Sequence, residues 1–399
     1  MKTTLEKTSI KQEQVKKAEL LTGAEATAHA MRQINPDVFP VYPITPQTPI
    51  IQTFSSLVAD GKADSEIINV ESEHSAMSAA IGSASAGGRT MTATASQGLA
   101  LMIENVYIAA SMRLPIVVAI GNRALSAPIN IHCDHSDSML ARDSGVIQIF
   151  VENAQEAYDF MVMAPRLAEQ EDILLPVLVN QDGFTITHTA EPVLMLEDDK
   201  VRRWVGEYKI PYPLLDQKNK TTQGPFDMPD YYFEHKRQQE EGMSHVFARY
   251  EELSREYREI SDRHYETVEA YKLEDADRAI VVMGSTAGTV KEVVDRLREK
   301  GEKVGVLKIR FFRPFPEQAI LKALYSVRKV SVLDRAMSFG SYGPLFMEMA
   351  GVLYDMPINL YNYIYGLGGR EIYPEDIEKV YKDMKTKNTE KKSYIGLRT

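Results

Sequence analysis

The chain has 399 residues, enough for two or three domains of about 150 residues each. Its 44% hydrophobic and 26% charged residues are typical of a globular protein, and its net charge of −10, with no basic cluster, argues against nucleic-acid binding. No apolar run reaches the ~18 residues of a membrane span, and the N-terminus lacks the apolar core of a signal peptide, so we expect a cytoplasmic protein with no membrane segment.

Strand and helix patterns alternate over residues 21–190, after an N-terminal extension at 1–20. Residues 114–120 are continuously apolar, as in a strand that is buried on both faces. Such alternation predicts a doubly wound α/β domain, in which helices cover both faces of a parallel sheet. The expected helices are 23–34, 72–86, 97–111 and 155–168, and the expected strands are 38–41, 67–70, 89–95, 114–120, 146–151 and 173–179.

Residues 191–272 begin as an irregular connection that is rich in Pro, Lys and Asp. Asp227-Met-Pro229 then has the composition of a helix start, with an N-cap candidate and proline in the first turn. Apolar residues three or four positions apart follow as far as Tyr271, and they predict one helix of about 40 residues. This helix could dock a partner or pack along the chain's own domains.

A second, smaller doubly wound unit is predicted for residues 273–399. A tight turn at Gly284–Gly288 joins its first strand and helix and lacks the lysine of a phosphate-binding loop. The lysine-rich end after residue 385 is expected to be a loosely held tail. The expected strands are 279–283, 304–311, 328–333 and 358–363, and the expected helices are 289–300, 345–354 and 374–387.

The first segment with potential chemistry is Tyr-Pro-Ile-Thr-Pro-Gln-Thr-Pro at residues 42–49. Three prolines in this short stretch favour a stiff, extended loop, because proline fixes its own φ and restricts the residue before it. The loop follows a predicted strand, and ligands of open α/β sheets bind at the carboxyl ends of the strands. It is either a rigid connector or a platform that presents Tyr42 and Thr45.

Two carboxylates, Glu71 and Glu73, flank Ser72 where a strand gives way to an Ala-rich helix. A carboxylate in the first turn stabilises the helix dipole, and we assign this capping role to Glu71 rather than to Glu73. One of the two should point to solvent and the other into the crevice at the strand ends. A carboxylate in such a crevice could exchange a proton with a ligand nitrogen.

Arg123 follows the continuously apolar strand and has no acidic residue close behind it in the sequence. An arginine of this kind is either a surface residue or a clamp for a ligand carboxylate. The amides of Ser96-Gln-Gly98, between a strand and a helix, offer a weak anion site.

Cys133 is the chain's only cysteine, so this chain can form no intrachain disulfide and no Cys-ligated iron–sulfur cluster of its own. Cys133 could be a nucleophile, but an ordinary thiol is favoured. The segment His132-Cys-Asp-His135 has metal-ligand residue types crowded into one loop without a second cluster, so we predict no metal site. Gln181-Asp-Gly183 lacks the following Asn that would suit Mg²⁺-diphosphate binding, and any such half-site should lie in another chain.

Several motifs together resemble the 2-oxoacid:ferredoxin oxidoreductases, and most of all the alpha subunit of the multi-subunit pyruvate enzyme. They occur in the family's order over residues 20–365. They are Tyr42–Ile50, Val70–Met77, Thr94–Met102, Asn122–Pro128, Arg142–Gly145, Arg313–Pro316 and Leu333–Arg335. The resemblance implies a pyrimidine-type thiamine diphosphate-binding domain at 21–190 and a transketolase C-terminal-like domain at 273–399.

The family oxidatively decarboxylates a 2-oxoacid with coenzyme A and passes electrons to ferredoxin. The resemblance implies thiamine diphosphate shared with a beta subunit. It also implies Mg²⁺ and [4Fe-4S] clusters in partner subunits of the beta, gamma and delta types.

By position, Glu73 matches the catalytic glutamate that hydrogen-bonds the aminopyrimidine of the cofactor. Thr45 and Arg123 match the residues that hold the substrate carboxylate, while Tyr42, Pro43 and Ile44 shape the wall beside the cofactor. Thr45 in place of a second arginine suits pyruvate, although a branched-chain 2-oxoacid stays open. A non-catalytic assembly scaffold is the alternative from another functional class.

Overall fold

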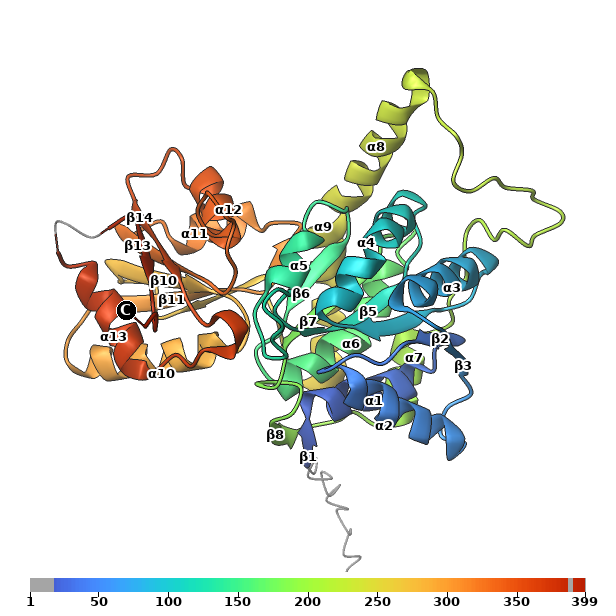
Figure 1. Cartoon of the computed structure of the whole chain (residues 1–399), viewed down its shortest axis with the longest axis horizontal. Coiled ribbons are helices and arrows are strands. Elements are labelled where there is room, and N and C mark those ends of the chain that lie inside the picture. Colours follow the sequence, from blue (N-terminus) through green and yellow to red (C-terminus); the bar gives the residue numbers. More distant parts are fainter. Residues whose placement is uncertain (1–17, 387–389, 399) are drawn as a thin grey trace, which may run out of the picture.

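The computed structural model describes residues 18–386 and 390–398, and it contains two α/β bodies joined side by side (Figure 1). The sheet of the first body has the order β12-β6-β7-β5-β4, and β4 to β7 run parallel. The short parallel pair of β2 and β3 adjoins β4 through a bridge between Val38 and Thr90. The strands are β2 (Val38–Val41), β3 (Glu66–Asn69), β4 (Met91–Thr94), β5 (Val117–Asn122), β6 (Ile147–Phe150), β7 (Val177–Asp182) and β12 (Phe311–Arg313).

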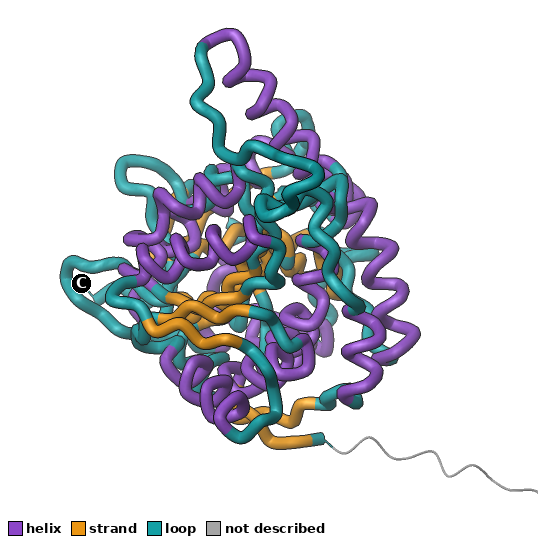
Figure 2. Tube along the Cα trace, turned by 90° about the vertical axis from the view of Figure 1, so that its right-hand side faces the viewer, coloured by secondary structure: helices purple, strands orange, loops and turns teal. Residues whose placement is uncertain are grey.

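Helices cover both faces of this sheet, as the alternating pattern predicts (Figure 2). Val117 and Ala119 of β5 face the core formed with α1 and α6, whereas Val118 and Ile120 face the core formed with α3 and α4. The helices of this body are α1 (Gly23–Ile34), α2 (Thr48–Ala59), α3 (Glu73–Ala86), α4 (Ser96–Ser111), α5 (Ser136–Leu140) and α6 (Ala154–Ala168). The predicted doubly wound class is therefore confirmed.

Two strands begin later than predicted and end later as well. β5 and β7 begin at Val117 and Val177. Pro176 directly precedes β7 and Pro115 lies two residues before β5, and proline lacks the N–H that a strand ladder needs. Both strands continue into polar residues, to Asn122 and Asp182, which an apolar pattern does not reveal. Helix α2 was not predicted, although Pro49 lies in its first turn, where proline is well tolerated.

The prediction of a single helix of about 40 residues is wrong. The chain forms α8 (Pro229–Ser244) and α9 (Val246–Ser261), then reverses at Asp262, which has φ 64°, and enters strand β9 (Val268–Tyr271). Helix α9 packs against α6, and the buried Tyr257 hydroxyl donates to Asp159 at 2.5 Å. The N-terminal part of α8 instead projects from the body (Figure 1). Its Tyr231, Tyr232 and Phe233 are exposed. Before these helices lie β8 (Ala190–Val193), paired with β1 (Glu19–Thr22), and α7 (Asp198–Val205).

The second body has a six-stranded sheet in the order β15-β14-β13-β10-β11-β9, in which only β9 is antiparallel to its neighbour. The prediction of a loose C-terminal tail is wrong for residues 392–394, which form strand β15 beside β14. Residues 387–389 and 399 of that tail lie outside the described residues, as do residues 1–17 of the predicted N-terminal extension. No helix in the described part of the chain is long and apolar enough to cross a membrane. The remaining elements are β10 (Arg278–Val282), β11 (Val304–Ile309), β13 (Lys329–Asp334), β14 (Asn359–Ile364), β15 (Lys392–Tyr394), α10 (Thr286–Glu299), α11 (Glu317–Ala323), α12 (Pro344–Val352), α13 (Pro374–Asp383) and a 3-10 turn (Leu367–Gly369).

A buried charge cluster joins the two bodies. Glu156 of α6 accepts from Lys308 Nζ at 2.6 Å and from Arg310 Nη2 at 2.9 Å, and both cations belong to the second body. Burial raises the pKa of Glu156, but Arg310 and Lys308 lower it more, so that the pKa falls to about 2. Removing this carboxylate would take one anionic partner from each buried cation, leaving Lys308 with Glu152 and Glu269 and Arg310 with Glu269.

We expect Glu156→Gln to lower the free energy of unfolding at pH 7 by about 3 kcal/mol. The reason is that Arg310 and Lys308 stabilise the ionised carboxylate of Glu156 in the folded state but not in the unfolded state. Since its folded pKa is depressed, this stability is present above pH ~4.5 and is lost as the pH falls toward ~2. Urea unfolding at several pH values checks the prediction, with the exposed Glu259→Gln as control. Equal unfolding midpoints for the two variants at pH 7 would contradict it.

Candidate active site at the strand ends of the first body

The loop after β2 is held by a residue that the sequence did not single out. Gln47 is fully buried, and its Nε2 donates to the carbonyl oxygens of Tyr42 at 3.0 Å and Ala93 at 3.3 Å. These bonds fix the loop against the end of β4. Tyr42 and Ile44 are half-buried, whereas Pro43 and Thr45 are exposed. The loop is thus anchored from behind and presents its tip outward.

Glu73 lies inside the protein at the start of α3. Ser72 is the N-cap, since its hydroxyl accepts the N–H of Ser75 at 3.2 Å, so the capping role expected for Glu71 belongs to Ser72. Glu71 is exposed and accepts from the Ser75 hydroxyl at 2.6 Å. Glu73 is only 7% exposed. The two carboxylates therefore have different environments, and only Glu73 lies in the interior.

Gly98 of α4 packs directly against Glu73. A Cβ on Gly98 would lie 2.8 Å from both Cγ and Oε1 of Glu73, and 2.3 Å from the Thr94 hydroxyl oxygen. The Thr94 hydroxyl is buried and has no hydrogen-bond partner among the described residues. Glycine at this position therefore leaves the space in which the Glu73 carboxylate and the Thr94 hydroxyl lie.

Arg123, directly after β5, contacts the loop that follows β2. Its Nη1 donates to the carbonyl oxygen of Thr45 at 3.0 Å, and its Nε donates to that of Asn130 at 2.9 Å. The residue is 7% exposed, and within the described part of the chain its guanidinium forms no ion pair with a carboxylate. Arg123 and Thr45 are thus in contact, and the contact uses the main chain of Thr45.

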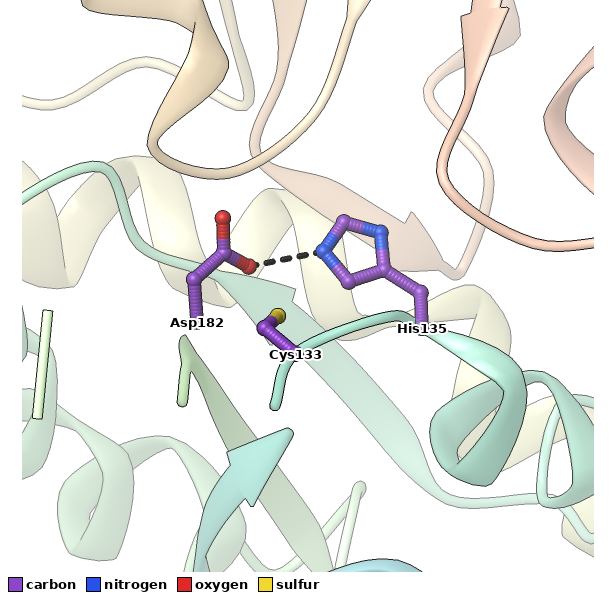
Figure 3. Close-up of side chains that lie close together, drawn as sticks. All are labelled: Cys133, His135 and Asp182. Carbon is purple, nitrogen blue, oxygen red and sulfur yellow. Dashed lines mark hydrogen bonds and ion pairs between the residues drawn. The ribbon is translucent and has the colours of Figure 1, made fainter. Parts of the chain in front are cut away.

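A second buried cluster contains Cys133, His135 and Asp182 (Figure 3). Nε2 of His135 lies 2.7 Å from Oδ1 of Asp182, while Oδ2 of Asp182 accepts from Arg335 at 2.8 Å and from the Ser285 hydroxyl at 2.5 Å. Burial raises the pKa of Asp182, but Arg335 and His135 lower it more, and the net shift is downward. Oδ1 is therefore bonded within the first body, whereas the bonds at Oδ2 connect the two bodies.

Cys133 lies in the same cluster and is buried. Burial raises the pKa of its thiol well above the ordinary value, so a thiolate nucleophile is disfavoured at neutral pH. The segment His132-Cys-Asp-His135 has metal-ligand residue types; in the structure the His135 side chain bonds to Asp182 of the same body, and its backbone N–H donates to the carbonyl oxygen of Arg335 in the second body. Sequence reasoning missed Gln47 and Asp182 as organising residues, because their partners are distant in the chain.

Comparison with solved structures shows which class of fold the chain has. A 2-oxoglutarate:ferredoxin oxidoreductase from Magnetococcus marinus aligns over 93% of this chain and 66% of its own, with a TM-score of 0.74 and 20% identity. A split-gene transketolase aligns over 91% of this chain and 98% of its own, with a TM-score of 0.56 and 12% identity. The chain has the α/β fold shared by these two kinds of enzyme.

Sequence comparison then identifies the family. The model described as "Pyruvate flavodoxin/ferredoxin oxidoreductase, thiamine diP-bdg" matches residues 29–257, and "Pyruvate:ferredoxin oxidoreductase core domain II" matches residues 276–377. Pyruvate synthase subunit PorA of Thermotoga maritima is 55% identical over 95% of this chain and 97% of its own length. The PorA subunit of Methanocaldococcus jannaschii is 46% identical over 95% and 98%. The chain belongs to the pyruvate:ferredoxin oxidoreductase family.

We expect Gly98→Ala to destabilise the protein by about 1–3 kcal/mol, because the new methyl group must displace Glu73 or Thr94 from a packed site. Gly82→Ala in α3 is the matched control: no atom would lie within 4 Å of its Cβ, and alanine should stabilise that helix by up to about 1 kcal/mol. Chemical unfolding of the purified variants compares them. Similar effects of the two substitutions would show that the space beside Glu73 is not tightly filled.

Proposed function

We propose that this chain is the alpha-type subunit of a pyruvate:ferredoxin oxidoreductase. The assembled enzyme would convert pyruvate and coenzyme A to acetyl-CoA and CO2, with electrons passing to ferredoxin. The observation that carries the proposal is the guanidinium of Arg123, which is buried at the strand ends, held by Thr45, and without a carboxylate partner among the described residues. Such a group suits the carboxylate of a 2-oxoacid. The names of the relatives support pyruvate as the acid.

Thiamine diphosphate suits the other half of the site. The buried Glu73, the bare Gly98 and the unpartnered Thr94 hydroxyl offer polar groups and space for an aminopyrimidine. When bound, the cofactor supplies the electron sink that decarboxylation requires. Glu73 would hold a proton at the pyrimidine nitrogen, and Tyr42, Pro43 and Ile44 would form the adjacent wall. Arg123 and Thr45 would orient the substrate carboxylate.

The other parts of the enzyme are proposed to lie in partner subunits. A single cysteine cannot ligate a [4Fe-4S] cluster, so the clusters are assigned to beta-, gamma- and delta-type subunits, with Mg²⁺ and the cofactor diphosphate on the beta-type subunit. Within this chain, residues 21–190 would be the pyrimidine-binding domain and residues 273–399 the transketolase C-terminal-like domain, with the connection at 191–272 between them.

A branched-chain 2-oxoacid is the second candidate substrate. Ketoisovalerate oxidoreductase subunit VorA of Pyrococcus abyssi is 41% identical over 92% of this chain. The carboxylate clamp would serve both acids, because they share the 2-oxocarboxylate group. The acid preference of the assembled enzyme distinguishes the two candidates.

We expect Glu73→Gln in the assembled complex to remove most 2-oxoacid-dependent reduction of a dye, because glutamine cannot exchange the carboxylate proton. The variant should still assemble, since the two side chains have nearly the same shape. Glu71→Gln, on the exposed neighbour, is the control and should keep normal turnover. Normal turnover of Glu73→Gln would refute its proposed role and favour a non-catalytic scaffold.

We expect Arg123→Ala to lower kcat/KM about hundredfold for pyruvate and for a branched-chain 2-oxoacid alike, because it removes the shared carboxylate contact. The exposed Arg296→Ala of α10, which removes an ion pair with Glu292, is the control. Steady-state kinetics with both acids measures the loss, and the wild-type preference identifies the substrate. An unchanged kcat/KM in Arg123→Ala would exclude the clamp.

A further inference from the structure

A second buried carboxylate, that of Asp137 in α5, lies behind the candidate site. Asp137 is fully buried. Its Oδ2 accepts from the backbone N–H groups of Ser96 at 2.9 Å and Arg123 at 3.0 Å. Its Oδ1 accepts from Asn122 Nδ2 at 3.0 Å and from the N–H of Ser138 at 2.8 Å. Burial raises the pKa of Asp137 to about 6, against the lowering effect of these hydrogen bonds, so the group is mostly ionised at neutral pH and acts as an acceptor.

The two N–H groups on Oδ2 belong to the segments that follow the neighbouring strands β4 and β5. Ser96 begins α4 and has a left-handed φ of 46°, which is unfavourable for a residue other than glycine and needs support from its surroundings. Two residues later, Gly98 packs against Glu73. Arg123 is the first residue after β5 and carries the guanidinium that contacts Thr45. One oxygen atom of Asp137 therefore binds the backbone of both segments.

We propose that Asp137 is a positioning residue, which fixes the separation between the turn that supports Glu73 and the strand end that carries Arg123. This inference rests on the proposed function. A second bond joins the same two segments, because the Ser96 hydroxyl donates to the carbonyl oxygen of Ala124 at 2.6 Å. The Asp137 link is the stronger of the two, since hydrogen bonds to an ionised acceptor are roughly twice as strong as neutral ones.

The test is Asp137→Asn in the assembled complex. Asparagine keeps the shape of the side chain but places an NH2 group against donors at one end, so one pair of bonds is lost. We expect kcat/KM for pyruvate to fall tenfold to a hundredfold, because a small misplacement of reacting groups has effects of about this size. The effect should appear both as a higher KM, from Arg123, and as a lower kcat, from Glu73.

Asp334→Asn is the matched control in the second body. Asp334 is also buried and accepts from two backbone N–H groups, those of Leu345 at 2.7 Å and Phe346 at 3.1 Å, and from Asn362 Nδ2 at 2.7 Å. It should lose stability to a similar degree, as measured by thermal unfolding, but keep the KM for pyruvate.

A double-mutant cycle separates positioning from general destabilisation. In an Arg123→Ala background, Asp137→Asn should no longer change the KM, because the group that it positions is gone. A full, additive increase in KM in that background would overturn the inference. If Asp137→Asn does not fold, Ser96→Ala removes the second link between the same segments and should give the same KM and kcat pattern with smaller amplitude; wild-type kinetics of that variant would count against the inference.

The failure of this inference is distinguishable from failure of the proposed function. Normal kinetics of both Glu73→Gln and Arg123→Ala would contradict the function. Loss of activity in those two variants, with Asp137→Asn no different from Asp334→Asn, would contradict the positioning role alone.

Discussion

The arrangement of the site depends on how two buried carboxylates find hydrogen-bond donors. An ionised carboxylate in a protein interior is very unfavourable unless it is paired, so each one constrains the elements that supply its donors. Asp137 takes its donors from the ends of β4 and β5, within the first body. Asp182, at the end of β7, takes its donors from His135 in the first body and from Arg335 and Ser285 in the second. The segment from His135 to Asp137, at the start of α5, takes part in both sets of bonds.

Much of the fold could be predicted from the sequence, because the buried strands and their helices carry a strong periodic signal. The errors concern strand ends and a helix break, which the apolar periodicity does not show. β5 and β7 end in polar residues that an apolar run does not include, and the predicted long helix is interrupted at His245 and ends at Ser261, before the left-handed Asp262. A spacing of three or four residues is compatible with both halves and does not reveal the break at His245.

The candidate site was predictable to the extent that its residues follow strands directly. Tyr42, Glu73 and Arg123 each stand just after an apolar segment, where the carboxyl ends of parallel strands converge. Gln47 and Asp137 have no such local signal, and although Asp182 ends an apolar strand, its bonding partners are distant in the sequence. Asp182 bonds to His135, 47 positions earlier, and to Arg335, 153 positions later, and no pattern within a short window contains that information. Supporting residues of this kind become visible only when the chain is folded.

The residues of the candidate site differ in burial: some are held in the interior by this chain, and others are exposed to solvent. Glu73 and Arg123 are each 7% exposed, so their charged groups are already largely withdrawn from water and held by the fold of this chain. Pro43 and Thr45, by contrast, are exposed at the tip of a loop that Gln47 anchors from within. Desolvated, oriented charges act more strongly on a ligand than mobile ones in water, because little reorganisation is needed when the ligand arrives. The loop tip is therefore the part of the candidate site that the fold of this chain leaves exposed, while the charged groups of Glu73 and Arg123 are already held in place.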